Sequence, residues 1–224
     1  MRKDLTEVVF ILDRSGSMSG LERDTIGGFN SMIEKQRKEK GEALISTVLF
    51  DDKNEVLYDR IPVSRVEPMN DKQYFVRGCT ALLDAIGGAI DHIAKVHKQE
   101  GKEERPAKTL FIITTDGMEN ASRKYDYKKV KKMVEKRKEK DGWEFLFLGA
   151  NIDAIAEAGK FGISADRSHN FVCDAAGTSL NYRALSGAIS AFRNAGSRKE
   201  MGEALVESME AVEEDYNRRS KGGK

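Results

Sequence analysis

The chain has 224 residues, of which 39% are hydrophobic, enough to predict one folded domain with a full core. Its 38 basic and 37 acidic residues nearly cancel, which argues against nucleic acid or an anionic membrane as the main partner. The first apolar run is too short for a signal peptide and no run approaches the roughly 18 residues of a membrane span, so a soluble cytoplasmic protein is expected.

Two periodicities alternate along the first half of the chain. Residues 7–13 are expected to form a buried strand, and the apolar stripe after Ser19, with Glu22 placed as in a capping box, predicts a helix. Residues 43–52 and 55–63 are rich in β-branched and aromatic residues and predict an antiparallel hairpin.

The second half continues the alternation. In chain order we expect a helix at 82–96, a strand at 109–117, a basic helix at 127–140, a strand at 143–150, a short helix at 151–162, a strand at 168–173 and helices at 178–195 and 199–216. Only the terminal residues 218–224 look disordered. Strands that alternate with helices indicate a doubly wound α/β fold, with a mostly parallel sheet of six strands, one antiparallel edge strand and helices on both faces.

Polar side chains follow the strands of this expected sheet. Asp13 and Asp116 each end an apolar strand, Ser15 and Ser17 follow in the first loop, and Thr80 precedes the next helix. In such folds ligands bind beyond the carboxyl ends of the strands. A set of oxygen donors favours a hard divalent cation, Mg²⁺ first and then Mn²⁺ or Ca²⁺. Neutral hydroxyls leave such a cation short of negative charge, so it would seek an anion from outside.

The pattern resembles the von Willebrand factor type A (VWA) domain. DRSGS at 13–17 matches the Asp-x-Ser-x-Ser motif of that family, Thr80 in GCTALLDAI matches its loop threonine, and Asp116 in TTDGMENAS matches its last aspartate. The fold that this resemblance implies is Rossmann-like. The resemblance also implies an intact metal-ion-dependent adhesion site (MIDAS).

In that site, the resemblance implies direct binding of the metal by Ser15, Ser17 and Thr80. Asp13 and Asp116 would act close by or through water, and an acidic side chain of a partner protein would complete the octahedron. The implied function is metal-dependent protein binding without catalysis.

The resemblance covers residues 6–195, which implies a VWA domain over residues 1–196 and a C-terminal helical extension with a disordered basic tail over residues 197–224. With FLGANIDAIAEAGKFGI at 147–163, the chain looks most similar to the short cytoplasmic members of bacteria and their phages. An intracellular scaffold or regulator is therefore expected.

Two alternatives stay open. A phosphatase of the haloacid dehalogenase type also places an aspartate after its first strand, but it needs a second aspartate two residues on as general acid, where this chain has Ser15. A VWA fold with a vestigial metal site is the other. Either loop alone is also typical of a helix cap or a turn.

Cysteines and histidines outside the motifs are expected to be structural. Cys79 and Cys173 are too few for a disulfide framework, and we expect both to be packed thiols. His92 and His97 lie five apart, and a surface role is expected for both.

Charged groups near the motifs and in two helices suggest further roles. Asp84 lies one turn beyond Thr80 and could orient that loop. The basic helix is expected to be a solvated face rather than a nucleic-acid contact. The acidic helix at 199–216 is a candidate for partner docking, or for reaching a neighbour's metal site through Glu213 or Glu214.

Overall fold

A six-stranded sheet forms the centre of the structure, a computed structural model that describes residues 1–221. Its strands, in chain order, are β1 (Arg2–Asp13), β2 (Glu42–Phe50), β3 (Asn54–Pro62), β4 (Pro106–Thr115), β5 (Glu144–Gly149) and β6 (Ser168–Asn170). The order across the sheet is β3-β2-β1-β4-β5-β6, and only the β2–β3 pair is antiparallel. The doubly wound fold with one antiparallel edge strand is confirmed.

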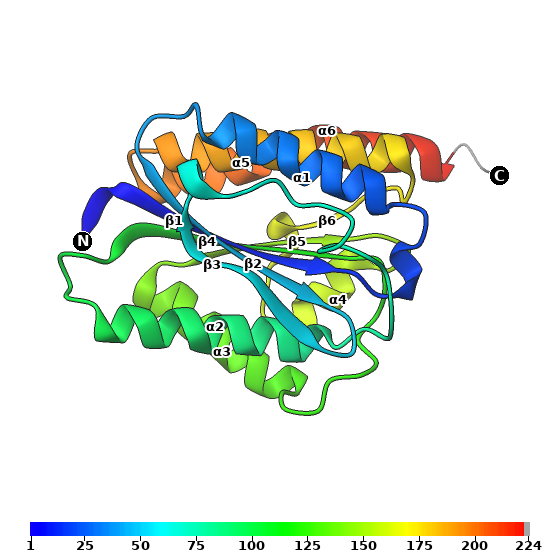
Figure 1. Cartoon of the computed structure of the whole chain (residues 1–224), viewed down its shortest axis with the longest axis horizontal. Helices are drawn as coiled ribbons and strands as arrows, with labels where there is room; N and C mark the ends of the chain where they lie inside the picture. The colour runs from blue at the N-terminus through cyan, green and yellow to red at the C-terminus, as the bar shows by residue number, and fades with distance from the viewer. Residues whose placement is uncertain (222–224) are drawn as a thin grey trace.

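Helices cover both faces of this sheet (Figure 1). They are α1 (Glu22–Gln36), α2 (Leu82–Gln99), α3 (Tyr127–Asp141), α4 (Ala154–Lys160), α5 (Ala175–Asn194) and α6 (Arg198–Lys221). α1, α5 and α6 lie on one face, and α2, α3 and α4 lie on the other. None of the helices within residues 1–221 is long and apolar enough to cross a membrane.

The central strands are apolar at successive positions because both of their faces are buried. In β1, Val8, Phe10 and Leu12 belong to the core cluster that includes α1, α5 and α6. Val9 and Ile11 point the other way, into the cluster that includes α2 and α3. A continuous apolar run is typical of a parallel strand covered by helices on both sides.

The start of α1 differs from the sequence prediction. Leu21 precedes Glu22 as the cap residue and makes no side-chain cap hydrogen bond, so the predicted capping box is wrong. Ser19 instead ends a short 3₁₀ turn over Gly16–Met18. The Glu22 carboxylate accepts from the backbone N–H of Gly20 at 2.7 Å, so it stabilises the turn before the helix rather than a capping serine.

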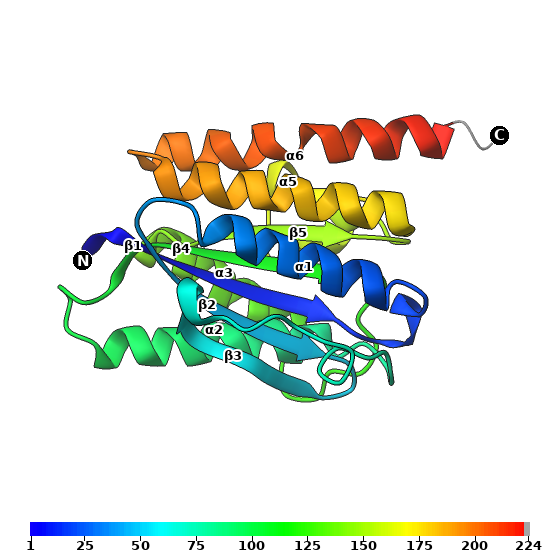
Figure 2. The same ribbon diagram turned by 45° about the horizontal axis from the view of Figure 1, so that its top comes forward.

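α6 is longer than expected and belongs to the core. It runs to Lys221, so residues 218–221 are helical where disorder was predicted, and residues 222–224 lie outside the described part of the chain. Figure 2 shows α6 lying along α5 as the outermost helix. Three of its apolar side chains are fully buried in the same cluster as β1 and α1, namely Leu205, Met209 and Val212. The domain boundary at residue 196 stays a prediction.

A buried ionic network occupies the amino-terminal half of the sheet. Glu7 is fully buried in β1, and its carboxylate accepts from Arg60 Nε at 2.6 Å and contacts His97 Nε2. The surface role predicted for His97 is therefore wrong, because α2 turns this side chain inward. His92 is on the surface, where its Nε2 lies 2.8 Å from Asp59 Oδ1.

Candidate metal centre

The two candidate aspartates lie beside each other at the carboxyl end of the sheet. β1 and β4 are parallel neighbours, so Asp13 and Asp116 reach the same edge. Asp13 is 1% exposed, and its Oδ1 accepts from the Ser15 backbone N–H at 2.7 Å. Its Oδ2 accepts from Thr115 Oγ1 at 2.7 Å and from the Asp116 N–H at 3.3 Å. Asp13 therefore fixes the first loop and the end of β4 to one another.

The three candidate hydroxyls converge beside these carboxylates. Ser15 Oγ lies 3.0 Å from Ser17 Oγ. A methyl group placed on Gly117 would lie 3.4 Å from Thr80 Oγ1 and 3.6 Å from Ser17 Oγ, so both oxygens surround the space over this glycine. Ser15 and Thr80 are buried and Ser17 is exposed, which leaves the group open to solvent on one side.

The chemistry of this donor set fits a hard divalent cation. Every candidate ligand offers oxygen, as Mg²⁺, Mn²⁺ and Ca²⁺ prefer. Within residues 1–221 there is no group of three or more His, Cys, Asp or Glu side chains arranged to hold a metal. A cation at this edge would therefore depend on the hydroxyls of Ser15, Ser17 and Thr80.

The Asp116 carboxylate is held by two loops that sequence reasoning missed. Its Oδ1 accepts from Asn151 Nδ2, and its Oδ2 accepts from Cys173 Sγ at 3.0 Å. Burial, and then the hydrogen bond to Asp116, raise the pKa of Cys173 to about 12, so the thiol stays protonated and donates. Asn151 follows β5 with φ of 54°, in the left-handed region that asparagine tolerates. Both oxygens of Asp116 are thus engaged in hydrogen bonds, so this carboxylate would reach a cation at this edge more readily through a water molecule than directly.

Burial changes the acidity of both carboxylates. Desolvation raises the pKa of Asp13 although Ser15 and Thr115 donate hydrogen bonds to it. Desolvation also raises the pKa of Asp116, and the hydrogen bonds from Cys173 and Asn151 offset this only in part. A cation bound beside these two buried carboxylates would be favourable, because its positive charge stabilises their ionised form.

The loop after Asp116 positions Thr80. The Thr80 N–H donates to Asn120 Oδ1 at 2.9 Å, and its carbonyl accepts from the Asn120 N–H at 3.0 Å. Glu119 accepts from the N–H of Leu83 at 2.8 Å, in the first turn of α2. Asp84 accepts from the backbone of residues 123–125. Asp84 therefore orients the loop after β4, and this loop in turn positions Thr80 through Asn120.

A buried ion pair supports the first loop from behind. Arg14 is fully buried, and its Nε donates to Asp51 Oδ2 at 2.8 Å, as does Arg77 Nε. Burial acts to raise the pKa of Asp51, but the hydrogen bonds from Arg77, Lys53 and Arg14 together outweigh it and lower that pKa. The other oxygen of Asp51 accepts from the Lys53 N–H at 2.8 Å, as in a turn, so Asp51 joins this turn to the two arginines.

Tyr74 completes this support, because its hydroxyl donates to the Asp13 carbonyl at 2.6 Å.

The prediction of packed cysteines is wrong for Cys79, which is exposed beside Thr80, whereas Cys173 is half-buried. The weak cap at Ala81, the residue before α2, was the one signal that could have pointed to Glu119 as the missing acceptor.

Comparison with known proteins supports the fold. No protein-family model matches the sequence, and no curated protein does either. Among solved structures, proximal thread matrix protein 1 from the mussel byssus aligns with a TM-score of 0.56 and 13% identity over 83% of this chain and 46% of that one. A von Willebrand factor type A protein from Catenulispora acidiphila aligns with a TM-score of 0.53 and 15% identity over 83% of this chain and 42% of that one.

This chain thus spans less than half the length of either protein. One structure of the mussel protein has a zinc-occupied MIDAS motif. At such low identity the likeness establishes the fold alone, which is VWA-like.

Proposed function

We propose that the chain is a metal-dependent protein-binding module that captures an Asp or Glu side chain of a partner protein at a divalent cation, Mg²⁺ first. Ser15, Ser17 and Thr80 would hold the cation directly, with Asp13 and Asp116 close by or acting through water. The proposal includes an intact MIDAS, a cytoplasmic location, a role as scaffold or regulator of the short bacterial or phage type, and no catalysis.

One observation carries this proposal. Hydroxyls from two distant loops, those of Ser17 and Thr80, border the same solvent-open space over Gly117. A glycine is present where any larger side chain would enter that space. Two buried carboxylates lie directly behind it. This is a donor set that a hard cation needs, assembled at the edge of the sheet where α/β folds bind ligands.

The charge of the site explains why an acidic partner is favoured. The three hydroxyls are neutral, and both oxygens of Asp116 are already engaged by Asn151 and Cys173. When bound, the cation would supply a positive charge that these side chains leave partly unbalanced. Met118 is 63% exposed directly after Gly117, so a partner would also meet an apolar side chain beside the carboxylate.

The geometry of Asp13 argues against the phosphatase alternative. A nucleophilic aspartate must present an oxygen to its substrate, whereas both oxygens of Asp13 accept internal hydrogen bonds and the residue is 1% exposed. Ser15 occupies the place of the general acid and cannot supply that proton. The other alternative, a VWA fold with a vestigial metal site, has to be excluded by a measurement of metal binding.

The acidic helix stays a candidate for docking through Glu214, which is exposed. Glu213 is less available, because its Oε1 lies 3.0 Å from His169 Nδ1 of the same chain. Removal of residues 197–224 would strip core side chains of α6, so Glu214→Gln is the cleaner variant for a measurement of mass in solution.

Isothermal titration of Mg²⁺ and Mn²⁺ into chelator-treated protein tests the proposal. The matched control is the Ser15→Ala, Ser17→Ala double variant, which removes two ligands and no charge. A hydrolase assay on a generic phosphate ester runs in parallel. We expect the wild type to bind and the variant not to bind, with no turnover by either.

Two outcomes would count against the proposal. Metal-dependent turnover that the double variant lacks would make the site catalytic. Absence of binding by the wild type, also with free acetate or glutamate present at high concentration, would make the site vestigial. A metal-dependent pull-down with acidic peptides follows from a positive result.

A further inference from the structure

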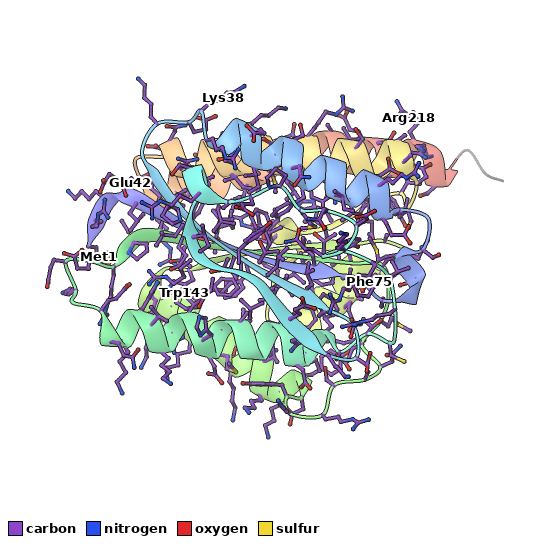
Figure 3. The ribbon with its side chains drawn as sticks, viewed as in Figure 1. Met1, Lys38, Glu42, Phe75, Trp143 and Arg218 are labelled. Atoms are coloured by element: carbon purple, nitrogen blue, oxygen red, sulfur yellow. The ribbon has the colours of Figure 1, made fainter. Side chains whose placement is uncertain are left out.

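A second concentration of charge lies at the end of the sheet opposite the candidate metal centre. A cavity of about 650 Å³ opens there between α2 and α3 and the start of β4. In Figure 3, Met1 and Trp143, which line this cavity, lie toward one end of the molecule, and Phe75, next in sequence to Tyr74, lies toward the other. The lining of the cavity includes six cationic side chains, namely Lys98, Lys102, Arg105, Lys136, Arg137 and Lys140. One carboxylate, that of Asp141, lines it with them.

Most of this positive charge has no partner. Arg137 Nη1 pairs with Asp141 Oδ2 at 2.7 Å. For the other five cations, no carboxylate within residues 1–221 lies within 4.0 Å. Arg105 donates through Nη2 to the Glu100 carbonyl at 3.2 Å, but its Nε is buried and makes no hydrogen bond. Five of the six positive charges are therefore available to pair with an anion in the cavity.

Helix ends explain only part of this arrangement. α2 and α3 both end beside the cavity, and cations in the last turn stabilise a helix because its end carries about half a negative charge. Two helix ends and Asp141 together offset about two of the positive charges. A local excess of about four remains, although the whole chain has a net charge of only +1.

We propose that this cavity binds a compact, multiply charged phosphate anion of the diphosphate or triphosphate class. The cations come from α2, from the loop before β4 and from α3, so they surround a hollow rather than follow one helix. Arg105 and Arg137 contribute guanidinium groups, which bind phosphate oxygens through paired hydrogen bonds. The anion could be free polyphosphate or the phosphate chain of a nucleotide, since both present the same group.

The geometry disfavours a strand of nucleic acid. Proteins that bind single strands stack successive bases on exposed aromatic rings along a groove. Here Trp143 lines the cavity but is only 3% exposed, and the Arg137 guanidinium lies 5.3 Å from the centre of its ring. Among the described residues, no exposed aromatic ring lines this cavity, so we infer that the phosphate group itself is recognised.

Trp143 also provides a readout, because it is the only tryptophan of the chain. We would titrate sodium tripolyphosphate into the full chain without divalent cations and follow both heat and tryptophan fluorescence. The cavity variant is Lys98→Ala with Lys140→Ala. The matched control is Lys128→Ala with Lys132→Ala, which removes the same charge from exposed positions of α3 outside the cavity.

We expect saturable binding by the wild type with a change in fluorescence. The cavity variant should lose about tenfold or more in affinity, because two charge-assisted contacts are removed. The control should lose less than about twofold, through long-range attraction alone. The Ser15→Ala, Ser17→Ala variant should bind tripolyphosphate as the wild type does, so failure of the metal proposal would leave this result unaffected.

Comparison of ligands identifies the source of the anion. Equal affinity for ATP and tripolyphosphate would support recognition of the phosphate chain alone, and tighter binding of ATP would support a nucleotide. Calorimetric affinities that fall equally in the two double variants would overturn the proposal, as would the absence of saturable heat. A single-stranded 20-nucleotide DNA that binds more tightly, with equal loss in both variants, would show an extended surface instead.

Discussion

Gly117 is the residue at which the candidate metal centre is tested most sharply. Its backbone is compatible with alanine, and an added methyl group meets only ordinary contacts, at 3.4 Å from Thr80 Oγ1 and 3.6 Å from Ser17 Oγ. The methyl group would nevertheless occupy the space that these oxygens border. We expect Gly117→Ala to fold normally and to bind Mg²⁺ at least about tenfold more weakly, measured by isothermal titration.

The control for this variant is Gly27→Ala in α1, where an added methyl group meets nothing within 4 Å. It should bind metal as the wild type does and gain about 0.5–1 kcal/mol of stability as a helix-interior alanine. Wild-type affinity in Gly117→Ala would mean that the ion is held elsewhere.

We expect His169 to make the stability of the fold depend on pH below about 6.5. Burial lowers the pKa of this imidazole, and the nearby Glu213 carboxylate offsets the shift only in part. The unfolded chain therefore binds a proton at this residue more readily than the folded one. The stabilisation is present above the unfolded pKa of about 6.5 and is lost as the pH falls below it.

Urea denaturation between about pH 7.5 and about pH 5.5 measures this effect. The wild-type free energy of unfolding should fall with decreasing pH, and His169→Gln should show a shallower slope, by at most about 1.4 kcal/mol per pH unit. The comparison concerns slopes, because the substitution also changes packing. Identical slopes would assign the dependence to other groups.

At the scale of single residues, the five candidate ligands could be predicted because each belongs to a short motif at the end of a strand or the start of a helix. Asn151 and Cys173 could not, since their contact with Asp116 depends on how β5 and β6 approach β4. The predictions of a packed Cys79 and of a surface His97 were wrong for the same reason. Burial of an isolated polar residue is decided by distant elements that its neighbours in sequence do not reveal.

Among the secondary-structure elements, α2 depends on a cap supplied from another loop. The methyl side chain of Ala81 cannot cap the first turn, and the Glu119 carboxylate accepts from the Leu83 N–H instead. The same carboxylate also accepts from Ala121 and Ser122. We expect Glu119→Ala to lower the free energy of unfolding by about 2–3 kcal/mol, because these donors lose a charged acceptor.

Urea denaturation again provides the measurement. The matched control is Glu135→Ala on α3, whose exposed carboxylate lies 4.0 Å from Lys131 and should matter by less than about 0.5 kcal/mol. Equal effects of the two substitutions would mean that Glu119 does not stabilise α2 as a cap.

α6 provides a second test at this scale, since adjacent residues differ in burial. Leu205 is fully buried in the core and Val206 is 36% exposed. Leu205→Ala should cost about 2–4 kcal/mol of stability, and Val206→Ala less than about 1 kcal/mol. Thermal and urea unfolding of both variants decide whether α6 is part of the folded domain. A small effect of Leu205→Ala would make α6 an appendage.

The elements themselves were predicted in the right order, and the errors lie at their ends. The apolar runs of β1, β4 and β5 specify buried strands without ambiguity. The predicted strand at 168–173 is shorter: β6 ends at Asn170, although the Phe171 N–H still donates to the Gly149 carbonyl of β5 at 3.1 Å. α6 has weak apolar content, and its packing against α5 favours a helix that continues to Lys221.

At the scale of the whole molecule, the two core clusters share one sheet and should unfold together. Neighbouring residues of β1, such as Val8 and Val9, belong to opposite clusters. We expect a single transition in urea, coincident for circular dichroism and for Trp143 fluorescence. Mg²⁺ at about a hundredfold excess over its dissociation constant should add about 2.7 kcal/mol to the free energy of unfolding.

Gly117→Ala should show the same single transition without the gain from Mg²⁺. Two separate transitions would mean that the faces of the sheet fold independently. A gain from Mg²⁺ that persists in Gly117→Ala would contradict the assignment of the site.

The candidate metal centre is built from segments that are far apart along the chain, from Ser15 to Thr80, Asp116, Asn151 and Cys173. Its contacts between distant segments form only when β1, β4, β5 and β6 have joined one sheet. Such non-local contacts form late, so an ion held there would leave the rate of folding unchanged and would slow unfolding. A bound ion would therefore prolong the lifetime of the native state against proteases, and it would take no part in the nucleus from which the chain folds.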